Sequence, residues 1–403
     1  WKEVPPVFEL DLVGVPVDSL FVRPFVTTIG GDTVYGNQIA IANEDPNRNH
    51  IYNFSTESGD FSPENYTITT TSEITFQNII SLNSINWSYS SPNYSDIVIV
   101  NFPNLDRING DFRLNYEFSL REFNAPKLRE INRRLLLSYN NIEKFLLPSL
   151  QSIRSNKSNI SNNSSLIEID FSELEYIEQS LFVYANHSLT TLHFPNLYNV
   201  HNSDAYNSHG LRIYQNENLK EVTFNSSNDF IGYLRIYDNL VLENVLFENV
   251  EHLENADINI YNNTSLLEIK FPALISSSYF KPNDGNKPQH RININNNESL
   301  INIDFSSLKN FNFLNIKNNN ALTEINFPLL EIIHQSLNLS GNTSLNTINA
   351  PMLVTTGDKR YQVNSLYINS NNSLANVDFD SLLKVYTSLT VENNQQLDLN
   401  DFP

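Results

Sequence analysis

The residues of this chain that could do chemistry are mainly asparagines in Asn-x-Ser/Thr sequons, tyrosines beside arginines, and scattered carboxylates and histidines. Sixteen sequons occur in the 403 residues, and each is a potential acceptor for an N-linked glycan. Heavy glycosylation would indicate a secreted or surface protein. Because a chain rich in Asn and Ser produces sequons by chance, the fold decides which of them can carry a glycan.

Seven residues form a possible binding face on four successive copies of a repeat. They are Phe182, Tyr184, Arg212, Tyr214, Arg235, Tyr237 and Tyr261. Strand alternation points all of them outward. Stacked aromatics beside arginines are typical of a contact surface for protein or sugar. The alternative interpretation is that aromatics favour strands and stack only for stability.

Signals for catalysis and for metal binding are poor. The sequence has no G-x-S-x-G, H-E-x-x-H, P-loop or G-x-G-x-x-G motif. A polysaccharide-cleaving solenoid needs carboxylates on adjacent coils, whereas Asp170, Asp304 and Asp378 have no carboxylate at the equivalent place on the next coil. The histidines and aspartate of residues 201–210 could bind a metal, although such loop residues are usually solvated. We therefore predict no enzyme, no cofactor and no metal site.

These residues must be positioned by a repeat whose clearest copy is INIYNNTSLLEIKFPAL, residues 258–274. Its template, L-x-I-x-x-N-x-S-L-x-x-I-x-F-P-x-L, recurs at intervals of 22 to 34 residues with a basic period near 23. Such a period is typical of a solenoid, in which each repeat buries its apolar side chains against its neighbours. The recurring asparagines are Asn163, Asn186, Asn216, Asn239, Asn263, Asn297, Asn319, Asn342, Asn371 and Asn394.

Within one copy, Ile258 and Ile260 alternate with polar residues, as in a strand buried on one side. Ile269 and Phe271 mark a second short strand, and Leu274 begins a third inward-facing edge. The sequence thus predicts an all-β fold, a right-handed β-solenoid of about 13 coils. The repeated asparagine falls at the bend after the first strand, where its amide can bond adjacent coils as an Asn ladder. A turn residue without a ladder is the alternative.

Six of the sequons coincide with ladder positions, and a buried ladder amide cannot carry a glycan. Of the ten sequons off the ladder, Asn159, Asn162 and Asn262 are crowded by neighbouring sequons or by the turn, and we therefore predict glycans at the other seven. They are Asn53, Asn65, Asn86, Asn93, Asn156, Asn225 and Asn338.

The chain divides into an N-terminal segment, residues 1–63, and a solenoid domain, residues 64–403. Because an open solenoid end exposes unpaired strand edges, the first segment is expected to cap the first coil. In the alternative, one of its strands completes a neighbouring subunit by β-augmentation and builds a filament. Three inserts, residues 201–210, 276–290 and 355–364, fall at one template position, so we expect them at one corner, about three coils apart.

The net charge of −20, from 25 basic and 45 acidic residues, argues against nucleic acid and anionic membranes as partners. No cysteine is present, and no apolar run approaches the length of a transmembrane helix. The first residue is Trp1, and the last repeat stops at Pro403. We expect a removed leader and a longer natural product, with any membrane anchor outside this sequence.

The repeat, clearest at 336–353 and 180–200, resembles the receptor L domain, the leucine-rich-repeat-like β-solenoid of insulin- and EGF-receptor ectodomains. It looks still more like the fungal GPI-anchored cell-wall glycoproteins built from the same repeat. The resemblance covers roughly residues 64–403. It implies an extracellular protein of the cell surface or cell wall, with roles in wall integrity, adhesion or ligand recognition. Its partners would be N-linked glycans and other surface proteins, polysaccharide or copies of itself.

Overall fold

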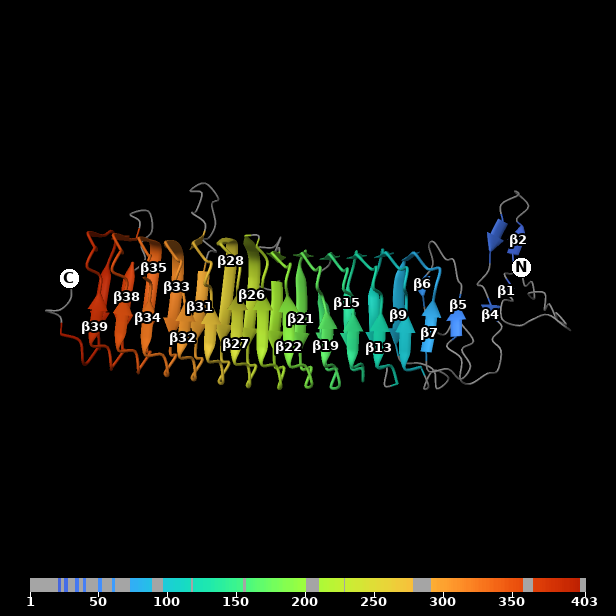
Figure 1. Ribbon diagram of the computed structural model, residues 1–403, viewed down its shortest axis with the longest axis horizontal. Coiled ribbons are helices and arrows are strands. Elements are labelled where there is room, and N and C mark those ends of the chain that lie inside the picture. The colour runs from blue at the N-terminus through green and yellow to red at the C-terminus, as the bar shows by residue number, and fades with distance from the viewer. Residues whose placement is uncertain are drawn as a thin grey trace, which may run out of the picture.

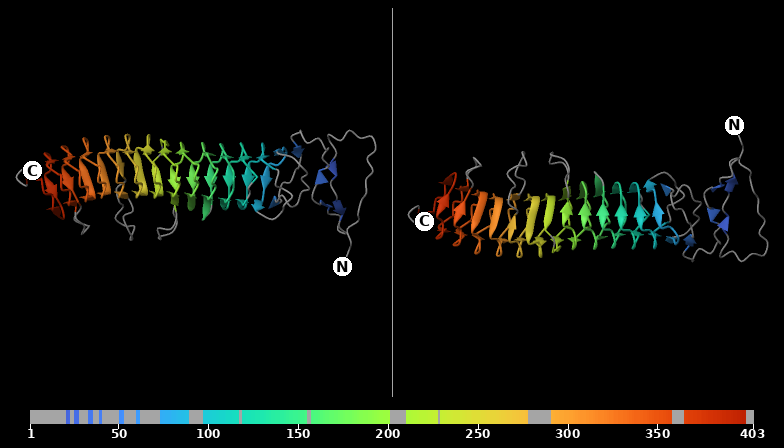
Figure 2. Two further views of the ribbon diagram at one scale, coloured as in Figure 1. Left: turned by 90° about the horizontal axis from the view of Figure 1, so that it is seen from below. Right: turned by 90° about the horizontal axis from the view of Figure 1, so that it is seen from above.

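The structure is a computed structural model. It describes residues 73–88, 97–116, 119–154, 157–200, 210–227, 229–277, 291–357 and 365–398, and the backbone of six short strands between residues 21 and 61. In these residues all regular structure is β, and from β5 onward the strands stack in parallel into a long solenoid (Figures 1 and 2). The predicted all-β solenoid is therefore confirmed.

One strand of each coil, called here the first strand, belongs to a ladder that runs along the rod. The Leu, Ile and Val residues at its inward positions are buried in all but the last coil, because the next coil covers them. In the part of the chain from residue 73 to 398 that the structure describes, thirteen such strands make about 12 turns. They are β9 (Ser84–Ser88), β12 (Phe112–Asn115), β15 (Leu135–Ser138), β18 (Ser158–Ser161), β21 (Ser180–Tyr184), β24 (Gly210–Tyr214), β26 (Phe230–Tyr237), β28 (His252–Tyr261), β31 (Arg291–Asn295), β33 (Asn310–Lys317), β35 (Ile332–Ser340), β38 (Leu366–Asn369) and β41 (Leu389–Glu392).

The second strand of each coil lies on the opposite side of the rod. Its outward positions are polar or charged in most coils, as the sequence predicts for a solvated face. These strands are β7 (Glu73–Phe76), β10 (Ile99–Asn101), β13 (Glu122–Asn124), β16 (Lys144–Leu146), β19 (Glu168–Asp170), β22 (Thr191–Phe194), β25 (Glu221–Phe224), β27 (Asn244–Phe247), β29 (Glu268–Lys270), β32 (Asn302–Asp304), β34 (Glu324–Asn326), β36 (Thr347–Asn349) and β39 (Asn376–Asp378).

The third edge of the coil is a two-residue strand that is hydrogen-bonded into the same sheet as the first strands. In β26, β28, β33 and β35 the third edge and the following first strand form one continuous strand. The register shifts at the corner in the β26–β28 and β33–β35 pairings. Gly232 makes one such corner possible, because it has φ +112° and a Cβ there would lie 1.7 Å from the Val200 carbonyl oxygen. The separate third edges are β8 (Ser81–Leu82), β11 (Arg107–Ile108), β14 (Glu130–Ile131), β17 (Ser152–Ile153), β20 (Tyr176–Ile177), β23 (Asn199–Val200), β30 (Ser276–Ser277), β37 (Thr355–Thr356) and β40 (Lys384–Val385).

The inserts begin and end at the corner between the third edge and the first strand. They separate β23 from β24, β30 from β31 and β37 from β38, so each follows the previous one after three coils. This is the predicted spacing and position. The inserted residues 201–209, 278–290 and 358–364 lie outside the described residues.

The core is a continuous stack of phenylalanines between the two sheets. Successive rings from Phe76 to Phe327 have centroids 4.3 to 6.5 Å apart, and the closest pair is Phe247 and Phe271. Each ring packs on those of neighbouring coils, as is typical of aromatic pairs. The phenylalanine stack therefore holds each coil to the next from the coil of Phe76 to that of Phe327.

The N-terminal strands are of two kinds. β1 (Phe21–Val22) pairs with β4 (Ile39–Ala40), and β2 (Phe25–Thr27) with β3 (Thr33–Tyr35), both antiparallel. In contrast, β5 (His50–Tyr52) and β6 (Asp60–Phe61) pair in parallel with β7 and β9. Solenoid-type pairing thus reaches back into the segment that the sequence assigned to a cap.

Candidate functional site

An asparagine ladder runs inside the bend after the first strands. At Asn216, the Oδ1 atom accepts the backbone N–H of Asn186 at 3.1 Å, and Nδ2 donates to the carbonyl oxygens of Val183 at 3.0 Å and Tyr214 at 3.1 Å. The same N–H to Oδ1 step repeats ten times at 3.0 to 3.2 Å. Because these groups are buried, each amide satisfies backbone atoms that water cannot reach.

All ten asparagines named from the sequence occupy this ladder, and the structure adds Asn140. Its Nδ2 donates to Leu114 O at 2.8 Å, and its backbone N–H to Asn163 Oδ1 at 3.1 Å. The template missed it because the turn is one residue shorter there, so the spacing from Asn140 to Ile142 is two instead of three. A search that allowed one deletion would have found it.

The residue before each ladder asparagine adopts the left-handed conformation, with φ between 53° and 71° from Tyr139 to Asn393. Only one of these eleven residues, Gly341, is a glycine. Side chains at such a φ cost free energy, and the ladder hydrogen bonds that follow offset this cost. The bend is therefore held by the asparagine more than by the residue in the strained position.

Six of the sequons have their asparagine in the ladder. Asn163, Asn186, Asn263, Asn297, Asn342 and Asn371 are all fully buried. Since Nδ2 of each donates hydrogen bonds inside the rod, a glycan on it is incompatible with this fold.

The seven sequons chosen as glycan sites have three different outcomes. Asn86 in β9 and Asn225 after β25 are exposed. Asn338 is half-buried in the middle of β35, and among the described residues its Oδ1 has no hydrogen-bond partner. That position is crowded by the equivalent Asn315 of β33, which makes it a poor acceptor. Asn53, Asn65, Asn93 and Asn156 lie outside the described residues.

The four tyrosines of the predicted binding face form one stack, called here the tyrosine column. Ring centroids of Tyr184, Tyr214, Tyr237 and Tyr261 follow one another at 4.7 to 4.8 Å, with interplanar angles of 4° to 8°. Neighbouring rings cover one another's faces, so the column presents ring edges and hydroxyls outward. The pKa of Tyr214 is raised to about 12, mainly by its partial burial and to a smaller extent by the neighbouring Tyr237 and Tyr184. Its hydroxyl thus stays a hydrogen-bond donor at neutral pH.

The other members of that face lie beside the column in register. Phe182 of β21 pairs with Arg212 of β24, which pairs with Arg235 of β26. The Arg212 guanidinium carbon lies 5.1 Å from the Phe182 ring centroid, a cation–π arrangement. All seven residues are thus neighbours on one sheet. A second stack, Tyr116 with Tyr139 at 5.0 Å and 4°, is more exposed and lies at the bend.

The carboxylates considered for catalysis have structural partners. Asp170 accepts the backbone N–H of Ser172 at 3.0 Å, and His193 Nδ1 lies 2.7 Å from Thr223 Oγ1. Within the described residues no group of three or more His, Cys, Asp or Glu could hold a metal ion. The candidate loop ligands at 201–209 lie outside that part of the chain.

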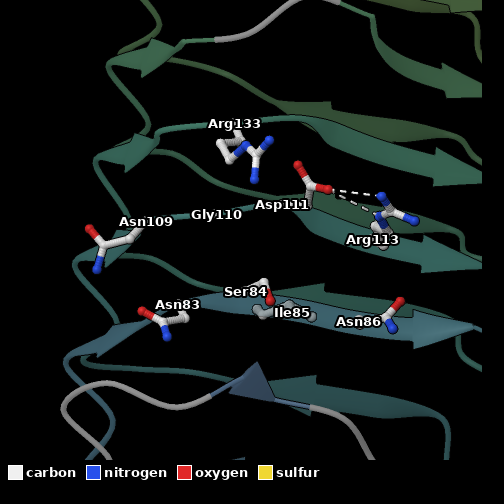
Figure 3. A pocket seen from close by; sticks show the side chains of 9 residues that line it. All are labelled: Asn83, Ser84, Ile85, Asn86, Asn109, Gly110, Asp111, Arg113 and Arg133. Carbon is white, nitrogen blue, oxygen red and sulfur yellow. Dashed lines mark hydrogen bonds and ion pairs between the residues drawn. The ribbon is translucent and has the colours of Figure 1, made fainter.

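A polar hollow on the first-strand face was not predicted. It has a volume of about 490 Å³ and spans β9, β12 and the residues before β15 (Figure 3). We call it the basic hollow, and it is lined by Asn83, Ser84, Ile85, Asn86, Asn109, Gly110, Asp111, Arg113 and Arg133. The sequence held a signal for it, since ten of the 25 Lys and Arg residues, against five Asp and Glu, lie in residues 107–157.

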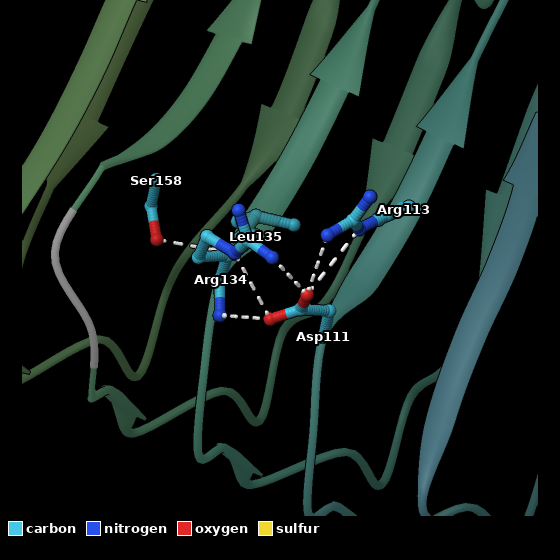
Figure 4. A network of polar contacts seen from close by, with 5 residues as sticks. All are labelled: Asp111, Arg113, Arg134, Leu135 and Ser158. Atoms are coloured by element: carbon cyan, nitrogen blue, oxygen red, sulfur yellow. Dashed lines mark hydrogen bonds and ion pairs between the residues drawn. The ribbon is translucent and has the colours of Figure 1, made fainter. Parts of the chain in front are cut away.

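Asp111 is the centre of the polar network at this hollow (Figure 4). Its Oδ2 accepts hydrogen bonds from Arg134 Nη2 at 2.6 Å and Arg113 Nη2 at 2.9 Å, and its Oδ1 accepts the Arg134 backbone N–H at 3.2 Å. Burial alone would raise the pKa of Asp111, but these hydrogen bonds outweigh it and lower the pKa to about 2. The carboxylate is therefore ionised at neutral pH.

Comparisons with known proteins add little to this picture. No protein-family model and no curated protein matches the chain. Among solved structures, the chain is similar to a leucine-rich repeat protein from Bacteroides ovatus, with 15% identity, a TM-score of 0.36 and coverage of 90% of this chain and 88% of that one. Among the residues that the structure describes, none forms a helix with the length and hydropathy needed to cross a bilayer.

Proposed function

We propose that this protein is a secreted surface glycoprotein with a structural and adhesive role, for which the solenoid is a rigid rod. The observation that carries the proposal is the first-strand face, an unbroken sheet that bears the tyrosine column near its middle. The ladder and the phenylalanine stack satisfy the interior without help from a ligand. The resemblance of the repeat to fungal cell-wall glycoproteins agrees with this role.

Mapping of N-glycans on the natively purified protein tests the glycoprotein part. We expect glycans at Asn86 and Asn225, and bare ladder asparagines such as Asn186 and Asn263. Intact mass before and after enzymatic removal of glycans, followed by peptide mapping, measures both. Absence of any glycan would overturn the proposal, and occupancy at Asn186 or Asn263 would contradict the buried ladder.

A second candidate function, ligand binding through the tyrosine column, is favoured by the stacking geometry. Because ring faces are covered, recognition would use the hydroxyl row and the flanking Arg212 and Arg235, which suits hydroxyl-rich or carbonyl-rich partners. The choice lies between a neutral glycan and another protein, including a copy of this chain.

The double variant Tyr214→Phe/Tyr237→Phe removes two hydroxyls and keeps the stack. Binding is measured on an array of neutral oligosaccharides and on an immobilised copy of the chain, with Tyr116→Phe/Tyr139→Phe as the matched control. We expect at least a fivefold loss of binding in the first variant and less than a twofold loss in the control. Equal losses, or no binding to either surface, would reject this function.

A further inference from the structure

The basic segment, residues 107–157, differs from the rest of the chain in charge. Its ten basic and five acidic residues give this segment a net charge of +5. Since the whole chain has a net charge of −20, the remaining residues have a net charge of −25. Most of its arginines pair with a carboxylate that lies outside the basic hollow. Arg107 and Arg154 pair with Glu130 at 3.3 and 3.5 Å, and Arg129 pairs with Asp106 at 2.6 Å.

The basic hollow is different, because three arginines there face one carboxylate. Arg113 and Arg134 share Asp111, while Arg133 is exposed and makes no hydrogen bond or ion pair within the described part of the chain. Since Asp111 stays ionised, the local charge is about +2 at neutral pH. This excess is held in a fixed geometry, because the Asp111 network anchors two of the three guanidinium groups (Figure 4).

The neutral lining suits a sugar more than a bare ion. Amides of Asn83, Asn86 and Asn109 border the hollow, and all three are exposed. Gly110 lets the chain approach the previous coil, because a Cβ there would lie 2.5 Å from the Asn83 carbonyl oxygen. Amides bond hydroxyls as donor and acceptor, whereas guanidinium groups bind carboxylate or sulfate in a bidentate way. The size of the hollow is in the range of small-ligand sites.

We propose that the basic hollow binds an acidic saccharide, through a carboxylate or sulfate ester held by Arg133 and Arg113 and hydroxyls held by the asparagine amides. This site is two or more coils away from the tyrosine column and does not depend on it. The acidic remainder of the rod repels a long polyanion at low salt. At 0.15 M salt the screening length is about 8 Å, so the hollow acts locally.

The test measures binding of polygalacturonate, dextran sulfate and neutral dextran to the full chain at 0.15 M salt. Arg133→Gln is compared with Arg121→Gln, a control that removes one positive charge from the same segment on the opposite face, where Arg121 lies near Glu143. We expect Arg133→Gln to weaken polyanion binding about tenfold, because it removes a charged hydrogen-bond donor, and Arg121→Gln to weaken it less than twofold.

Because Asn86 lines the hollow and is a predicted glycan site, each protein is also tested in a Ser88→Ala background, which removes the sequon and keeps the Asn86 amide. If only polygalacturonate binds, the ligand group is a uronate, and if only dextran sulfate binds, it is a sulfate ester. Binding of both polymers means that the hollow accepts either oxyanion. Equal losses in the two arginine variants, equal binding of neutral dextran, or no polyanion binding in either background would overturn the proposal. These outcomes are independent of whether the protein is glycosylated.

Discussion

The Asn ladder and the tyrosine column lie two residues apart in the same coils, yet they follow different rules. The ladder keeps one residue type through eleven coils, whereas the column keeps tyrosine through four and gives way to Ser161 on one side and Asn295 on the other. A buried position with several backbone partners admits only an amide of the right length. A half-exposed position admits many side chains, so a run of one type there is more informative about function.

The largest expected effect is at the ladder. Asn216→Ala leaves two buried groups unpaired, the Val183 carbonyl and the Asn186 amide, and each costs about 1–3 kcal/mol. We therefore expect a loss of about 2–6 kcal/mol in the free energy of unfolding, measured by urea denaturation. Because solenoids can unfold in parts, hydrogen exchange at the Asn186 amide is the second readout.

The control for this variant is the adjacent Gln215→Gly. Gln215 is exposed and has φ 54°, which glycine adopts without strain. We expect a change within about 0.5 kcal/mol, as is usual for surface substitutions. A loss equal to that of Asn216→Ala would mean that the bend, and not the ladder amide, holds the coils together.

The next effect concerns Asp111, which is outward-facing but largely covered by its arginines. Its pKa is lowered from 3.8 to about 2, so its contribution to stability is full above pH 4 and is lost as the pH falls through 2. The shift corresponds to at most about 2 kcal/mol. Between pH 4 and pH 2, the free energy of unfolding should therefore change less in Asp111→Asn than in the wild type. Parallel curves would refute the network in Figure 4.

A comparable effect is expected at the column. Tyr237→Ser removes two ring contacts, each worth about 0.5–1.5 kcal/mol, so the free energy of unfolding should fall by about 1–3 kcal/mol. Tyr237→Phe keeps the stack and should be within about 0.5 kcal/mol of the wild type. If both variants unfold like the wild type, the column has no role in stability, which would strengthen its assignment to binding.

The smallest effect is spectroscopic. Burial raises the pKa of Tyr214 to about 12, and those of Tyr237 and Tyr261 in the same direction. The folded column should therefore ionise above the usual value of 10, and its contribution to stability should be lost between pH 10 and 12. Phenolate absorbance during alkaline titration measures this, and Tyr214→Phe should remove one late-titrating group. Ionisation of all tyrosines near pH 10 would contradict the stacking.

The repeat made most of the fold and the candidate face predictable. A 23-residue period and two-residue alternation of Leu, Ile and Phe can be satisfied only by stacked coils, so the inward residues and ten ladder positions followed from spacing. Asn140 was missed because its turn is one residue shorter. The sharing of one sheet by the third edge and the first strand was also missed, since it depends on corners such as Gly232 that no short motif marks.

The sequence by itself determined which side chains are buried and which face outward, because the alternation of a strand and the period of the coil leave no choice of side. Only the tertiary structure decided which outward residues meet. Asp111 and Arg134 are 23 residues apart, and their contact depends on the register between two coils. Stacking gives each residue neighbours from the adjacent coils, and in this way it brought Arg134 to Asp111 and placed the rings of four tyrosines face to face.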